Sequence, residues 1–195
     1  MKEAGKAQEG RKRAMRYYET ITLKNGDSAI IRNGEAADGE EVLYVFDKTH
    51  EETDFLYTYP GETDITAEAE GKFLQGKTDS DNEVELLAIV DGKVVGLAGF
   101  GSVGDKFKVR HRADFGISIL KDYWGLGIGK ALTKACIECA KNGGYTQLEL
   151  NAVAENEAAL NLYKKMGFVE FGRNPRGFNS RITGYQEVVY MRLEL

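Results

Sequence analysis

The sequence predicts a single α/β domain with a mixed, mainly antiparallel sheet flanked by helices. Two turn dipeptides, Asn25-Gly26 and Asp91-Gly92, each separate two apolar runs, and such dipeptides are strong signals for antiparallel hairpins. The second half of the chain instead alternates strand, helix, strand and helix, as in a layered α/β fold. The 195 residues, 42% of them hydrophobic, suit one domain with a core of useful size.

The elements can be placed in order along the chain. The strand signals are the hairpins 20–34 and 84–103, followed by 113–120, 146–153, 168–174 and 184–195. Helices are predicted at 36–49, within 63–77 (with Thr63 or Thr66 as the N-cap), along the apolar stripe of 128–139, and at 155–168. The basic segment 106–112 alternates cationic residues with others, which predicts a strand with a solvated outer face.

Composition narrows the class of partner. A net charge of −5 argues against nucleic acid, and no apolar stretch has membrane-spanning length. Residues 1–18 are predicted to be a polar arm without the apolar core of a secretory signal, and residues 19–195 the folded domain. Cys136 and Cys139 lie three apart on a predicted helix, a spacing that suits neither a disulfide framework nor a zinc site. We therefore expect a cytoplasmic protein without a metal.

The stretch YWGLGIGKAL, residues 123–132, places a glycine-rich turn between a strand and a helix. Backbone N–H groups at such a helix start favour an anion. Neither nucleotide fingerprint matches: the Walker loop lacks its Ser/Thr at Ala131, and G-x-G-x-x-G meets Lys130 or Leu132 where it needs glycine. A tight turn with only a structural role remains an alternative to an anion site.

Two blocks carry a family resemblance. ILKDYWGLGIGKAL resembles the pyrophosphate-binding loop of the GNAT superfamily of N-acetyltransferases, with Gly127 and Gly129 in register and Trp124 in place of the usual Gln or Arg. LELNAVAENEAALNLYKKMGF resembles the family's later motif, with Tyr163 in the position of its tyrosine. The resemblance covers residues 113–168 and implies a GNAT-type sheet with a splayed central strand pair.

The resemblance also implies how acetyl-CoA binds. Backbone amides of the glycine loop would hold the pyrophosphate, with the Lys130 ammonium close by, and the splayed strand would offer an N–H near Ile119 or Leu120 to the thioester carbonyl. Asn151 and Asn156 are candidates for the pantetheine arm, although Asn156 also suits a helix cap. The predicted CoA-binding residues are Ile119, Leu120, Lys121, Leu126, Gly127, Ile128, Gly129, Lys130, Ala131, Asn151, Asn156 and Tyr163.

The implied reaction is transfer of the acetyl group to a primary amine, on a small molecule or a protein N-terminus, by direct attack in a ternary complex. Tyr163 is the candidate acid for the leaving thiolate, and Asp114 or Glu149 the candidate base. Two alternatives stay open: a CoA-binding regulatory module without catalysis, and an unrelated phosphate-binding turn in an interaction protein. Homodimers are common in the family, so a homodimer is a further expectation.

Overall fold

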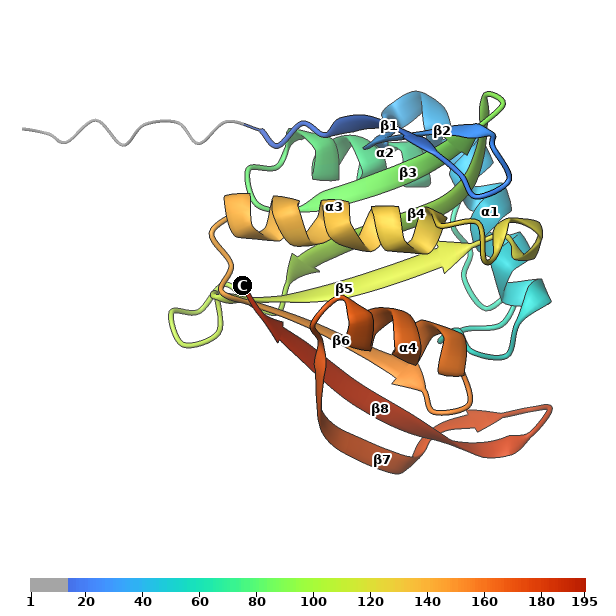
Figure 1. Cartoon of the computed structure of the whole chain (residues 1–195), viewed down its shortest axis with the longest axis vertical. Coiled ribbons are helices and arrows are strands. Elements are labelled where there is room, and N and C mark those ends of the chain that lie inside the picture. The colour runs from blue at the N-terminus through green and yellow to red at the C-terminus, as the bar shows by residue number, and fades with distance from the viewer. Residues whose placement is uncertain (1–13) are drawn as a thin grey trace, which may run out of the picture.

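The computed structural model describes residues 14–195 and shows one eight-stranded sheet with four α-helices (Figure 1). The sheet order is β1-β2-β3-β4-β5-β6-β8-β7, antiparallel throughout except for the parallel pair β5–β6. This confirms the predicted mixed, mainly antiparallel α/β fold. The predicted polar arm falls mostly on residues 1–13, which lie outside the described residues. The strands are β1 Tyr18–Thr22, β2 Ser28–Asn33, β3 Val84–Val90, β4 Lys93–Ser102, β5 Arg112–Ile119, β6 Gln147–Val153, β7 Val169–Ser180 and β8 Gly184–Glu194.

The helices are α1 Gly39–Glu52, α2 Ala67–Asp79, α3 Ile128–Asn142 and α4 Glu157–Lys165, with 3-10 turns η1 Ala36–Asp38 and η2 Lys121–Tyr123. Of the two N-caps left open for α2, Thr66 is the one used: its hydroxyl accepts a hydrogen bond from the Ala69 amide. Between residues 14 and 195, no helix is both long and apolar enough to cross a bilayer.

The basic segment 106–112 is a turn rather than the predicted strand. The amides of Val109 and Arg110 both bond the Lys106 carbonyl, and β5 begins only at Arg112. Within the turn, the Arg110 guanidinium lies 4.6 Å from the centre of the exposed Phe107 ring, so these two side chains contact each other. The predicted strand at 106–112 was therefore wrong, because alternating charges do not indicate a strand when neither face of the segment is buried.

The two faces of the sheet are covered by different helix pairs (Figure 1). Helices α3 and α4 lie on one face, and α1 and α2 lie on the other. Side-chain alternation in β3 shows the division, because Leu86 packs in the α3 core and Leu87 in the α1–α2 core. Cys136 and Cys139 are free cysteines that lie buried in the α3 core.

The parallel pair β5–β6 comes apart part-way along its length. The two strands are paired only from Arg112 with Gln147 to Asp114 with Glu149, although β5 continues to Ile119 and β6 to Val153. Beyond that point the facing edges have no ladder partner, which confirms the expected splay. Since α3 follows β5 and α4 follows β6, both helix starts lie at the open end of this gap.

Candidate active site

The glycine loop leaves backbone amides free at the start of α3. Gly127 is the N-cap, with φ of 106°, a left-handed conformation that suits glycine. The first amide bonded within the helix is that of Ala131, to the Gly127 carbonyl at 3.2 Å, so the amides of Ile128, Gly129 and Lys130 have no helical partner. Together with the positive end of a 15-residue helix, they form a site for an anion.

Three hydrogen bonds hold this loop in place. The Trp124 indole donates to the Ile119 carbonyl at 2.7 Å, the Lys24 amide to the Leu126 carbonyl at 3.1 Å, and the Lys121 amide to the Glu52 carboxylate at 2.7 Å. Trp124 therefore ties the loop to the end of β5. The Lys121 amide is engaged by α1, which lies on the opposite face of the sheet from α3.

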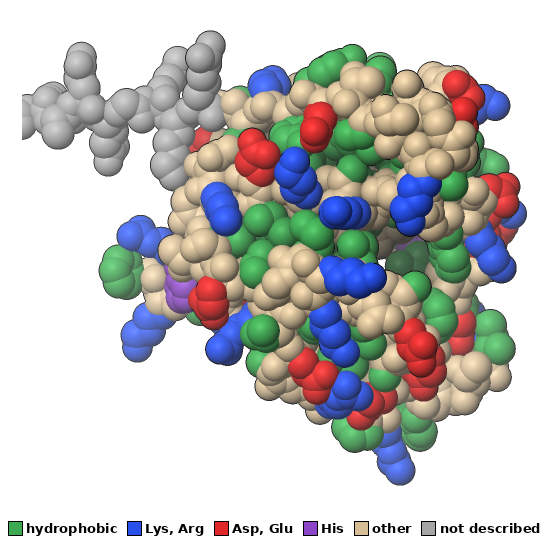
Figure 2. Space-filling model, viewed as in Figure 1, with side chains coloured by type: hydrophobic (Ala, Val, Ile, Leu, Met, Phe, Trp, Pro, Cys, Tyr) green, Lys and Arg blue, Asp and Glu red, His purple; other side chains and the backbone are tan. Residues whose placement is uncertain are grey.

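Cationic side chains surround the loop on the α3–α4 face (Figure 2). Lys and Arg gather over α3 and α4, where the surface is also hollowed between the helices. Lys130 and Lys134 on α3 and Lys164 on α4 are exposed. Their charge favours an anionic ligand at the helix start.

The backbone of β5 presents alternate amides to the gap. The Leu120 amide donates to the Val95 carbonyl on the β4 side, at 3.0 Å. Because N–H groups alternate in direction along a strand, the amides of Ile117 and Ile119 point the other way, toward β6. Of the two donors considered for the thioester carbonyl, the Ile119 amide is thus the one that faces the gap.

Tyr163 lies beside the gap on the α4 side with its hydroxyl unbonded. The residue is 6% exposed, and its ring contacts those of Phe115 on β5 and Phe168. Burial raises the pKa of the phenol, so it keeps its proton at neutral pH. No side-chain hydrogen bond of Tyr163 is present within residues 14–195, which is unusual for a buried tyrosine.

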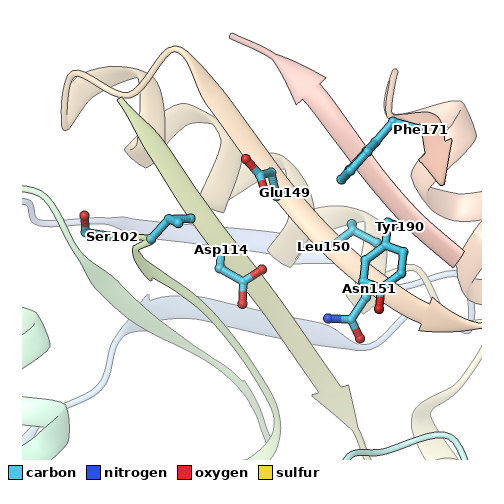
Figure 3. Close-up of a pocket in the computed structure, with 8 residues that line it drawn as sticks. Ser102, Asp114, Glu149, Leu150, Asn151, Phe171 and Tyr190 are labelled. Atoms are coloured by element: carbon cyan, nitrogen blue, oxygen red, sulfur yellow. The ribbon is translucent and has the colours of Figure 1, made fainter. Parts of the chain in front are cut away.

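Asp114, Glu149 and Asn151 line a hollow of about 420 Å³ where β5 and β6 separate (Figure 3). Glu149 is held by Arg112, whose Nε and Nη2 both donate to its carboxylate, the second at 2.7 Å. The Asp114 carboxylate has no hydrogen-bond partner among the described residues. Partial desolvation, and secondarily the charge of Glu149, raise the pKa of the Asp114 carboxyl. The two candidate bases therefore differ: Glu149 is ion-paired and Asp114 is free.

Asn156 caps α4, since its side-chain oxygen accepts from the Ala159 amide at 3.2 Å, while its amide nitrogen stays available. Asn151 is exposed on β6, opposite Tyr190 of β8. The predicted donor-site residues thus gather around one opening, formed by the end of β5, the start of α3, the splayed part of β6 and α4.

The model of the acetyltransferase (GNAT) family matches residues 46–168, which include β5, the glycine loop, α3, β6 and α4. The chain belongs to the GNAT acetyltransferase family. This GNAT protein superposes on the crystal structure of an acetyltransferase of GNAT family from Streptococcus pneumoniae with a TM-score of 0.81 and 32% identity, over 86% of this chain and 99% of that one.

Two further relatives extend the comparison. Salmonella typhimurium yncA, whose structure was determined with its cofactor acetyl-CoA, shares the fold at a TM-score of 0.75 and 18% identity, over 86% of this chain and 94% of that one. N-alpha-acetyltransferase 30 of Schizosaccharomyces pombe is 31% identical over 74 residues, which are 38% of this chain. That match spans about half of the length of the curated relative, 49%.

The described part of the GNAT protein has one buried acid that was not predicted from the sequence. Glu85 on β3 is 9% exposed and lies on the α1–α2 face. Burial raises the pKa of its carboxyl to about 8, with a smaller opposite effect from the charge of Lys77. The available signal was a single charge inside the otherwise apolar run VELLAIV.

Glu85 should make the stability of the GNAT protein depend on pH. The folded carboxyl holds its proton up to about pH 8, whereas the unfolded one loses it near ~4.3, so the free energy of unfolding falls as pH rises between these values. We expect Glu85→Gln to remove this part of the decline, so that its melting temperature relative to wild type is highest at pH 9. Thermal melts from pH 5 to 9 measure it, and parallel curves would contradict the prediction.

Proposed function

We propose that this GNAT protein transfers the acetyl group of acetyl-CoA to a primary amine, by direct attack while both substrates are bound. The free amides at the start of α3, placed beside the β5–β6 gap, are the observation that carries the proposal. They offer a pyrophosphate site at one end of the gap, and Asp114 lies at the other. The family and the yncA structure support acetyl-CoA as the donor.

The residues around the opening fit the donor. A Cβ added at Gly127 would meet nothing within 4 Å, so the loop has open space in front of its amides. The exposed Lys130 adds a cation at the first turn of α3. Asn151 and Asn156 offer side-chain hydrogen bonds along the gap. When bound, acetyl-CoA supplies the acetyl group as a thioester.

Asp114 is proposed to take the proton of the acceptor. A free alkylamine has a pKa near ~10.4 and arrives as an ammonium, which must lose a proton before its nitrogen can attack. The Asp114 carboxylate is unpaired among the described residues and faces the hollow. Glu149 is bound by Arg112. Its proposed role is therefore not that of the base; its negative charge raises the pKa of Asp114.

The transfer then needs a hydrogen-bond donor for the thioester carbonyl and a proton donor for the leaving sulfur. The acceptor nitrogen forms a bond to the acetyl carbon and the carbon–sulfur bond breaks, with the Ile119 amide donating to the carbonyl oxygen as it gains negative charge. The Tyr163 phenol gives its proton to the leaving sulfur, and the second proton lost by the acceptor nitrogen as the amide forms returns the phenol to its neutral state. Because burial raises the pKa of the phenol, Tyr163 is protonated before the transfer.

Mass detection of acetylated products tests the proposal directly. The purified protein is incubated with acetyl-CoA and a panel of small amines, amino acids and peptides with free N-termini, and thiol release is followed in parallel. We expect stoichiometric acetylation and thiol release with at least one acceptor class. Acetyl-CoA binding in a thermal-shift assay without any transfer would instead support a regulatory module.

The pH profile separates the two candidate bases. We expect kcat/KM for the acceptor to rise with pH on a limb set by Asp114, above the ordinary Asp range because desolvation and Glu149 raise its pKa. Asp114→Asn should remove this limb and lower kcat about 100-fold. Glu149→Gln should shift the limb to lower pH, since it removes a negative charge. Loss of the limb in Glu149→Gln alone would assign the base to Glu149.

A further inference from the structure

Three carboxyl groups without a cationic partner lie on the α1–α2 face: Glu70 on α2, Glu85 on β3 and Asp114 on β5. Desolvation raises the pKa of all three, and Glu70 also acts on Glu85 through its charge. Within residues 14–195, none of the three makes a side-chain hydrogen bond or an ion pair. Of the three, Glu85 is buried, Glu70 is half-buried and Asp114 is exposed. A buried acid without a partner, such as Glu85, destabilises the free protein and is typical of a binding site.

The buried carboxylate of Glu85 points across β4 toward β5. Gly99 of β4 pairs with Glu85 on one side and with Gly116 of β5 on the other. A Cβ at Gly99 would overlap the Oε2 atom of Glu85, so the carboxylate lies directly over that glycine. A Cβ at Gly116 would meet nothing within 4 Å, and Gly116 is exposed. The carboxylate thus borders open space above β5.

The nearest cation does not neutralise Glu85. Lys77 of α2 forms an ion pair with Glu83 at 2.8 Å and donates to the Phe100 carbonyl at 3.4 Å. Glu83 in turn accepts the Ser102 amide at 2.9 Å, which holds the pair over Gly101. The space beside Glu85 is therefore left for a positive charge from outside the chain.

The Glu85 carboxylate and Asp114 lie a short distance apart on this face of the sheet. Asp114 pairs with Gly101, and Gly116 with Gly99, so the Glu85 carboxylate is one strand across and two residues along from Asp114. With strands ~4.8 Å apart and a rise of ~3.3 Å per residue, this is about 8 Å. A short alkyl chain with an amino group at each end spans such a distance.

Resting on the function proposed above, we propose that the acceptor is a diamine: one amino group loses its proton beside Asp114 and is acetylated, while the other binds as an ammonium beside Glu85, whose carboxyl releases its own proton to solvent. The three unpaired carboxyls favour a second positive charge and oppose an acceptor that carries a carboxylate. The open glycines give the alkyl chain room above β4 and β5.

Kinetics with a matched pair of amines test the assignment. At pH 9, where the Glu85 carboxyl is ionised, we expect kcat/KM for 1,5-diaminopentane to exceed that for 1-aminopentane at least about tenfold, because an ammonium bound to a buried carboxylate makes a charge-assisted contact. Glu85→Gln should remove most of this preference. The control Glu68→Gln removes an equal charge from an exposed side chain of α2 and should keep it. Equal values for both amines, or a preference unchanged in Glu85→Gln, would overturn the inference while leaving the proposed function intact.

A binding measurement without acetyl transfer tests the diamine site separately from the proposed acetyltransferase function. Isothermal titration of 1,5-diaminopentane into the protein at pH 9, with no acetyl-CoA, should give a Kd that weakens about tenfold or more in Glu85→Gln. Gly116→Val, which fills the open space on extended backbone, should weaken it similarly while the Kd for acetyl-CoA is unchanged. Diamine binding with these losses but no acetylation would support the site and contradict the transferase function. No diamine binding would overturn the inference.

Discussion

Gly127→Val should raise the KM for acetyl-CoA at least about tenfold. The residue caps α3 with φ of 106°, which valine adopts only with strain, and its missing side chain leaves open space in front of the free amides. A branched side chain would both tilt those amides and occupy the space of the phosphates. Initial rates against acetyl-CoA concentration, at a saturating acceptor, measure the effect.

Gly144→Val is the matched control at the other end of the same helix. Gly144 has φ of 86° and also has nothing within 4 Å of a Cβ, so the backbone strain is comparable. Both variants should lose a few degrees in Tm, from roughly 1–3 kcal/mol of strain. Only the Gly127 variant should change the acetyl-CoA KM. A KM that stays at the wild-type value in Gly127→Val would remove the loop from the donor site.

Tyr163→Phe should lower kcat about 100-fold and leave stability nearly unchanged. The substitution keeps the ring that contacts Phe115 and Phe168 and removes only the phenolic proton. Because that hydroxyl is unbonded among the described residues, no hydrogen bond is lost from the fold. Single-turnover rates of thiol release, which report the chemical step, measure the effect.

Tyr145→Phe is the matched control, for which we expect a loss of stability without a loss of kcat. Tyr145 is also buried, but its hydroxyl accepts from the side-chain amide of Asn82 at 3.1 Å, and the residue lies just before the part of β6 that is still paired with β5. Its removal should cost about 1 kcal/mol of stability and leave kcat at the wild-type value. If Tyr163→Phe instead lost stability and kept its rate, Tyr163 would be a core residue and the leaving thiolate would be protonated from elsewhere.

Local signals in the sequence were sufficient for most of the elements. The Asn25-Gly26 and Asp91-Gly92 turns both join antiparallel strands, and the glycine loop lies at the start of a helix as expected. The segment 106–112 misled because alternation of charge says nothing about which face is buried. A strand requires a partner, and in this segment the amides bond within the turn.

The chemistry of the site depended on pairings between distant segments. The sequence marked Asp114 and Glu149 as equal candidates, and only the register of β5 on β6 places Arg112 where it can bind Glu149 and leave Asp114 free. Glu85 was missed because its position over Gly99 follows from the pairing of β3 with β4. Trp124, an irregular position in the motif, acquired a role once the Ile119 carbonyl was placed beside it.

The three bonds that hold the glycine loop have a consequence for the energetics of donor binding. Trp124, Lys24 and Glu52 restrain the loop from β5, from the β1–β2 turn and from α1, so its amides already point outward before any ligand arrives. A receptor that is preorganised in this way loses little conformational entropy on association. In the proposed complex, the affinity for acetyl-CoA would then reflect its direct contacts with the loop almost in full.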